Sequence, residues 1–253
     1  MQSFTPRLRP IGALLLCLLA PAAFAGPVKV AVAANVQYAF ADIAAAFTRD
    51  TGVAVEPSYA SSGKIATQVL AGAPFELFLS ADDETPRKLA SAGQTVAAPK
   101  TYALGALVLW SKDPGFDGKQ WQNWLKAASG KVAIANPQTA PYGAEALRVL
   151  DFYKLADSVK PRLVQGDNIA QAAQFVDSGA AQSGFVAKAL VLAPQMQGKG
   201  HWVDMPEQSH QPIVQDMALL KPAAANPDAR KLFDYLSSPA ARAILQRYGY
   251  RLP

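Results

Sequence analysis

The chain has 253 residues and a formal net charge of +5, and its basic residues are spread out without a run of like charges. A nucleic-acid-binding surface needs clustered Lys and Arg, so this spacing argues against that class of protein. The single cysteine, Cys17, lies in the apolar N-terminal segment, so the rest of the chain has no residue for a disulfide, a catalytic thiol or a thiolate metal site.

Residues 1–25 have the pattern of a cleavable signal peptide. Arg7 and Arg9 supply a positive start, and the small-x-small triplet Ala23-Phe24-Ala25 supplies a cleavage site. The apolar run between them is roughly ten residues long, whereas a membrane-spanning helix needs about 20. The sequence therefore predicts export from the cytoplasm with removal of this segment, rather than a retained membrane anchor.

From residue 26 onward, short apolar runs alternate with segments of helical periodicity. The apolar runs predict strands at residues 28–33, 53–55, 77–79, 106–110, 132–135, 183–186 and 217–220. Helices are predicted at residues 40–47, 142–153 and 169–176, after Ser62, after Asp82 or Asp83, and after the caps Asn226 and Ser238. Residues 194–211 are predicted to be mostly loop. The alternation indicates an α/β protein with parallel, covered sheets, in one domain or two.

In four places a short polar or small-residue turn follows an apolar run or opens a predicted helix. These turns lie at residues 33–35, 60–63, 138–143 and 167–169. Each places free backbone N–H groups and the positive end of a helix dipole at the carboxyl edge of a sheet, where α/β proteins bind ligands. Asn35, Ser62 and Asn168 are equally good helix caps. The pattern therefore supports an anion-receptive α/β protein and nothing narrower.

Four stretches carry a family resemblance that runs in order along the whole chain after the signal peptide. They are residues 30–35 (VAVAAN), 59–63 (YASSG), 71–82 (AGAPFELFLSAD) and 247–250 (RYGY). With them the chain resembles the molybdate-binding proteins of ABC transporters. The resemblance implies a two-lobed type II periplasmic binding protein, each lobe a mainly parallel sheet flanked by helices, with the ligand in the interlobe cleft. Residues 26–104 and 213–253 would form lobe I, and residues 105–212 lobe II.

The resemblance also implies which residues bind the oxyanion. Asn35 and Ser62 stand at the family's side-chain donor positions, and Tyr142 and Ile169 at its backbone donor positions. Ala34 and Ser61 are neighbours that could contribute. Many relatives carry a tyrosine where this chain has Ala187, and Tyr142 is expected to compensate, as in one subgroup of the family.

The function implied is capture of molybdate, and of tungstate, for an inner-membrane ABC permease. The resemblance implies a monomer without a cofactor, a catalytic residue or a directly bound metal cation. A receptor for sulfate, thiosulfate or another oxyanion remains an alternative. A periplasmic phosphate or sulfate ester hydrolase is a second alternative, and it would require a metal cluster or an activated nucleophile among the donors. A His, Asp or Glu side chain within hydrogen-bonding reach of Ser62 would favour it.

Overall fold

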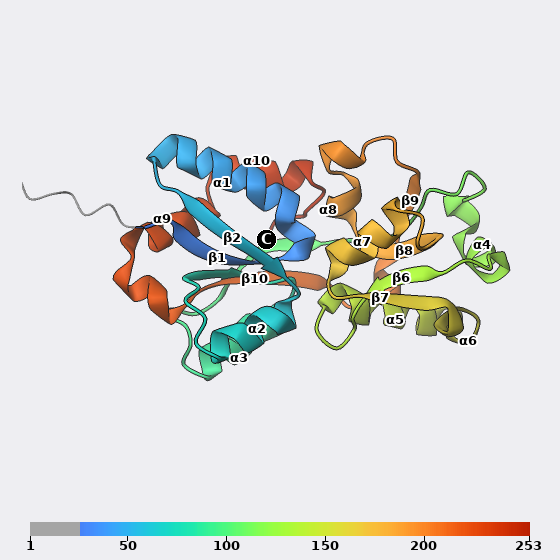
Figure 1. The fold of residues 1–253 in the computed structure, drawn as a ribbon, viewed down its shortest axis with the longest axis horizontal. Helices are drawn as coiled ribbons and strands as arrows, with labels where there is room; N and C mark the ends of the chain where they lie inside the picture. Colours follow the sequence, from blue (N-terminus) through green and yellow to red (C-terminus); the bar gives the residue numbers. More distant parts are fainter. Residues whose placement is uncertain (1–25) are drawn as a thin grey trace, which may run out of the picture.

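The computed structural model describes residues 26–253, and the predicted signal peptide at residues 1–25 lies outside them. Two five-stranded sheets lie side by side, each with helices packed on its faces (Figure 1). The expected two-lobed α/β architecture is therefore confirmed. Within residues 26–253, no helix has both the length and the apolar character that crossing a bilayer requires.

The first lobe contains the N-terminal and C-terminal parts of the described chain. Its elements are β1 (Val28–Ala33), η1 (Ala34–Val36), α1 (Gln37–Thr51), β2 (Val55–Ala60), α2 (Ser62–Leu70), β3 (Leu77–Leu79), α3 (Glu84–Ser91), β4 (Lys100–Gly105), β10 (Ile213–Leu219), η6 (Lys221–Ala225), α9 (Pro227–Tyr235) and α10 (Pro239–Arg247). The strand order is β2-β1-β3-β10-β4. Val28, Val30 and Val32 pack with α1, α9 and α10, and Ala31 packs with α2 and α3 on the opposite face, because side chains alternate along a strand.

The second lobe is one continuous stretch of chain. Its elements are β5 (Leu107–Ser111), η2 (Gly118–Gln120), α4 (Trp121–Ala127), β6 (Val132–Ala135), α5 (Pro141–Phe152), α6 (Ala156–Val159), η3 (Lys160–Arg162), β7 (Leu163–Gly166), α7 (Ile169–Asp177), β8 (Ser183–Ala187), α8 (Lys188–Val191), η4 (Pro194–Met196), β9 (His201–Asp204) and η5 (Glu207–Ser209). The strand order is β7-β6-β8-β5-β9. Trp110, Tyr142 and Phe185 are fully buried in its core.

The chain crosses between the lobes at two neighbouring places. The outward crossing joins Gly105 at the end of β4 to Leu107 at the start of β5, and the return crossing leads into Ile213 of β10. Ile213 and Gly105 are paired in the antiparallel ladder, so the two crossings lie side by side. Adjacent crossings of this kind form a hinge about which two lobes can open and close.

The sheets are mixed rather than mainly parallel as expected. In each sheet two strand pairings are parallel and two are antiparallel, because β10 and β5 run opposite to their parallel neighbours. The six interior strands were all predicted from apolar runs. At the sheet edges, β4, β7 and β9 were not predicted, and the strand predicted at residues 53–55 begins instead at Val55 and continues to Ala60.

Three predicted helix boundaries are confirmed by their cap geometry. Gly52 follows α1 with φ of 74°, a left-handed conformation that glycine adopts without a steric penalty. Asn226 Oδ1 accepts a hydrogen bond from Asp228 N–H, and Ser238 Oγ accepts one from Ala241 N–H. Each of these two N-caps is followed by a proline at the first helical position, Pro227 and Pro239.

Helix α5 approaches β6 so closely that only glycine fits at position 143. A Cβ atom there would lie 2.2 Å from the backbone oxygen of Ala135. We expect Gly143→Ala to lower the free energy of unfolding by about 1–3 kcal/mol, because a well-packed site must shift to admit the methyl group. Urea unfolding measures this difference.

The matched control is Gly115→Ala. A Cβ atom at Gly115 would meet only the side-chain oxygen of Asp113, at 3.2 Å, so its effect should stay within about 0.5 kcal/mol. Equal stability of the two variants would show that α5 is not held against β6 by this contact.

Candidate functional site

A small cavity lies between the two lobes. The first lobe lines it with residues from the ends of β1 and β2 and the starts of the elements that follow, and the second lobe lines it around the starts of α5 and α7. All six residues predicted for the site line this one cavity: Ala34, Asn35, Ser61, Ser62, Tyr142 and Ile169.

Backbone N–H groups at these element starts have no intrahelical partner, because the residues that precede them are not part of the helix. Within residues 26–253, the N–H groups of Ser62, Tyr142 and Ile169 also have no other hydrogen-bond acceptor. The same holds for Asn35 in η1. The two sheets thus bring four unpaired backbone donors to one buried place, although these residues are far apart in sequence.

The cavity lining carries no formal charge. Its side chains are alanines, serines, asparagines, a proline, a tyrosine and an isoleucine. Tyr142 is buried, and burial raises the pKa of its phenol well above the usual value, so the phenol is neutral. An anion bound here would therefore be held by hydrogen bonds and helix dipoles rather than by a counter-charge.

The lobes contact each other beside the cavity. Gly63 N–H donates to the backbone oxygen of Thr139 at 2.9 Å. Lys64 Nζ of α2 lies 3.0 Å from Asp167 Oδ1, which precedes α7 in the second lobe. These contacts show that the structure is the closed arrangement of the two lobes.

Ser62 is the first residue of α2 and its side chain does not cap the helix. Its hydroxyl is fully buried and accepts a hydrogen bond from Ala81 N–H at 2.9 Å. Because that bond uses a lone pair, the hydroxyl proton of Ser62 remains available to a ligand. Ser61 is the N-cap residue, and its buried Oγ has no partner within residues 26–253.

The surroundings of Ser62 also bear on the hydrolase alternative. Among residues 26–253, no imidazole or carboxylate hydrogen-bonds directly to Ser62. Ser80 Oγ lies 3.1 Å from Ser62 Oγ and 3.2 Å from Asp82 Oδ1. The hydroxyl of Ser80 therefore stands between the Asp82 carboxylate and Ser62. Burial raises the pKa of the Asp82 carboxyl, but its bonds with Thr85 N–H and Oγ1 hold it to the start of α3. A nucleophile paired with a base is not present in this arrangement.

Asn168 is a true helix cap, as its position predicted. Its Oδ1 accepts from Ala170 N–H and Gln171 N–H, each at 3.0 Å. These two bonds satisfy donors of the first turn of α7 but leave the Ile169 N–H unpaired. The cap therefore fixes the start of α7 with the Ile169 N–H available at the cavity.

Asn35 is held by partners that the sequence did not indicate. Its Nδ2 donates to Gln215 Oε1 at 3.0 Å and to Tyr250 Oη at 2.9 Å, while its Oδ1 is buried without a partner within residues 26–253. Gln215 lies at a β-bulge in β10, and no sequence pattern marks a bulge in advance. Tyr250 belongs to a family motif, but only the structure assigns its contact.

Tyr142 reaches the cavity and the network behind it at the same time. Its hydroxyl accepts a hydrogen bond from Gln215 Nε2 at 3.0 Å. Ala187 ends β8 and is fully buried, and within the described chain it is not part of the cavity lining. Through this bond, Tyr142 of the second lobe is joined to Gln215 of the first lobe. The expectation that Tyr142 compensates for the absence of a tyrosine at position 187 stays a prediction.

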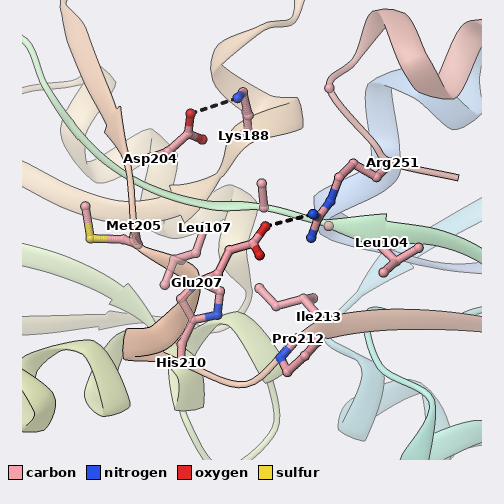
Figure 2. Close-up of a pocket in the computed structure, with 13 residues that line it drawn as sticks. Leu104, Leu107, Lys188, Asp204, Met205, Glu207, His210, Pro212, Ile213 and Arg251 are labelled. Atoms are coloured by element: carbon pink, nitrogen blue, oxygen red, sulfur yellow. Dashed lines mark hydrogen bonds and ion pairs between the residues drawn. The ribbon is translucent and has the colours of Figure 1, made fainter.

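A larger cavity lies beside the hinge and has a different chemistry (Figure 2). Its charged side chains are paired: Lys188 Nζ with Asp204 Oδ2 at 2.9 Å, and Arg251 Nη1 with Glu207 Oε1 at 2.7 Å. The carboxylates neutralise the cations and would repel a dianion. The smaller cavity, with unpaired neutral donors, is the better oxyanion site.

The two histidines do not form a metal pair. His201 is exposed on the edge strand β9, and His210 lies in the larger cavity with its Nδ1 2.8 Å from the backbone oxygen of Gln211. Within residues 26–253, no group of three or more His, Cys, Asp or Glu side chains is arranged to hold a metal ion.

Known proteins agree with this architecture. The model of bacterial extracellular solute-binding proteins matches residues 28–251. The molybdate-binding protein ModA of Azotobacter vinelandii is 46% identical over 93% of this chain and 94% of its own length, and that of Rhodobacter capsulatus is 42% identical over 94% and 93%. The solved structure of the periplasmic molybdate-binding protein of Azotobacter vinelandii matches with a TM-score of 0.84 and 35% identity, covering 89% of this chain and 99% of that one. The chain therefore belongs to the family of bacterial extracellular solute-binding proteins and, within that family, to the molybdate-binding proteins.

Proposed function

We propose that this protein captures molybdate, and also tungstate, in the periplasm and delivers it to an inner-membrane ABC permease. The observation that carries the proposal is the convergence of unpaired donors from Asn35, Ser62, Tyr142 and Ile169 on one uncharged cavity between two lobes. The names of the relatives at 46% and 42% identity support molybdate as the ligand. The protein acts as a binding protein and not as an enzyme.

The proposed mechanism is reversible capture by lobe closure. Residues 26–104 with 213–253 form one lobe and residues 106–212 the other, and the paired crossings at Gly105, the last residue of β4, and Ile213 act as the hinge. Closure brings the donors of both lobes around the oxyanion and replaces its water. The closed form then presents both lobe surfaces to the permease. The protein works as a monomer and needs no cofactor.

Backbone N–H groups can only donate, so they fit a ligand with no proton of its own. Molybdate, tungstate and sulfate meet this condition, whereas hydrogen phosphate carries an O–H that requires an acceptor in the site. Selection against phosphate therefore follows from unsatisfied hydrogen bonding, and selection against sulfate follows from the size of the closed cavity.

Calorimetry on the exported form of the protein tests the ligand assignment. We expect tight binding of molybdate and tungstate with similar Kd values, and much weaker binding of sulfate and phosphate. Sulfate binding as tight as molybdate binding would contradict selection by cavity size. Equally tight phosphate binding would contradict selection by donor-only chemistry.

Ser62→Ala tests the donor role of this hydroxyl. We expect the molybdate Kd to rise by roughly 10- to 100-fold, because a hydrogen bond to a charged group contributes about 1.5–3 kcal/mol. Titration calorimetry measures the Kd, and thermal unfolding without ligand measures the structural cost.

The matched control is Ser111→Ala in the second lobe. Ser111 is fully buried, and its Oγ accepts from Asp113 N–H and donates to the Gln182 backbone oxygen. Ser111→Ala should lower the melting temperature without changing the molybdate Kd. If Ser62→Ala behaves in the same way, Ser62 is a structural hydroxyl and not a ligand donor.

A further inference from the structure

Behind the oxyanion cavity lies a connected set of buried polar side chains, here called the amide–tyrosine network. Its members are all at most 4% exposed, and they are Asn35, Tyr102, Tyr142, Gln215 and Tyr250. Gln215 is its centre: Oε1 lies 3.0 Å from Asn35 Nδ2 and 2.8 Å from Tyr102 Oη, and Nε2 lies 3.0 Å from Tyr142 Oη. Such networks are stable when every donor meets an acceptor.

With both amides in this orientation, three groups of the network are mismatched. Tyr102 has one hydroxyl proton but faces two acceptors, Gln215 Oε1 and the backbone oxygen of Ser80 at 2.9 Å. Tyr142 Oη accepts from Gln215, and within residues 26–253 its own proton has no acceptor. Asn35 Oδ1 is buried without a donor. Asn35 lines the oxyanion cavity, and an acceptor oxygen there would repel the oxygens of a bound anion.

Rotating both amides by 180° exchanges their oxygen and nitrogen atoms and leaves the heavy-atom positions nearly unchanged. Gln215 Nε2 then donates to Asn35 Oδ1 and to Tyr102 Oη, which keeps its own proton for Ser80. Gln215 Oε1 accepts the proton of Tyr142. One mismatch arises in exchange: the proton of Tyr250 faces both Oδ1 and the backbone oxygen of Asn35, the latter at 3.1 Å. The rotated arrangement pairs more groups and leaves Asn35 Nδ2 free.

We propose that Gln215 is a positioning residue for oxyanion capture: it fixes the Asn35 amide in the rotated orientation, so that Nδ2 donates to the bound dianion. This inference rests on the proposed function. It also assigns a source of selectivity, since an Asn35 presenting Nδ2 offers no acceptor to the proton of hydrogen phosphate, whereas an Asn35 presenting Oδ1 would.

Two local features aim Gln215 at this task. The register of β10 against β4 shifts between Gln215 and Asp216, and Gln215 is fully buried at this bulge. A Cβ atom at Gly105 would lie 2.1 Å from Tyr142 Oη and 2.4 Å from Gln215 Nε2. Because glycine has no Cβ, these two groups can contact each other beside the hinge. Tyr142 comes from the second lobe, so closure itself delivers the proton that holds Gln215 in place.

NMR on ¹⁵N,¹³C-labelled wild-type protein tests the orientation directly. With saturating molybdate, the Gln215 Hε2 protons should give stronger NOEs to the Tyr102 ring than to the Tyr142 ring, and the Asn35 Hδ2 resonances should shift on binding. Stronger NOEs to Tyr142, together with stronger NOEs from Asn35 Hδ2 to Tyr250, would overturn the proposal.

Gln215→Met tests the consequence for affinity, because methionine has a similar length but cannot orient the amide. We expect the molybdate Kd to rise by about 10- to 100-fold, the strength of one hydrogen bond to a charged group. The ratio of phosphate Kd to molybdate Kd should fall, because Asn35 can then turn Oδ1 to a protonated ligand. Gln182→Met, which removes a partly buried glutamine bonded to Gly130 N–H and Asp113 in the second lobe, should change neither value.

The failure of the inference is distinguishable from failure of the proposed function. Wild-type protein that binds molybdate tightly, combined with a Gln215→Met variant whose Kd and selectivity are within twofold of wild type, would overturn the role of Gln215 and leave the function intact. Wild-type protein that binds none of the tested oxyanions would overturn both.

Discussion

The closed structure depends on how the backbone N–H groups of Asn35, Ser62, Tyr142 and Ile169 are satisfied. They lie at element starts, where the helix geometry cannot pair them, and lobe closure removes them from water. Each buried donor without an acceptor costs about 1–3 kcal/mol. A ligand with several acceptor oxygens removes that cost at all four groups at once. Closure and capture are thereby coupled, because the buried donors disfavour closure unless a ligand is bound to them.

The hinge is part of this coupling and not merely a connection. Gly105 ends a strand of the first sheet, yet the space at its Cα is filled by the hydroxyl of Tyr142 from the second lobe and the amide of Gln215. The amide–tyrosine network therefore lies where the chain crosses, directly behind the donors. Movement of one lobe about the crossing must break or form the Gln215–Tyr142 contact. In the larger cavity, by contrast, the Arg251–Glu207 pair is exposed and contributes little to stability.

The sequence predicted the interior of each sheet and not its edges. β6 is buried and apolar throughout, and β1 is buried except at Lys29; nearly continuous apolar runs mark such strands. The edge strand β2 has only half-buried and exposed residues and includes Pro57, which only an edge tolerates well. The site followed the same division: donors at strand ends could be placed from turns and family motifs, whereas Gln215 could not, because a bulge in β10 and contacts across 180 residues position it.

The uncharged lining of the cavity determines whether ligand capture depends on the protonation of the protein. None of the residues that line it ionises between acidic and neutral pH, since burial holds the Tyr142 phenol in its protonated form. The lining therefore neither takes up nor releases a proton when a dianion enters. A receptor that used a histidine as counter-charge would gain and lose affinity as the pH changes around the histidine pKa. Here, acidification acts on capture mainly through the ligand's own protonation equilibrium.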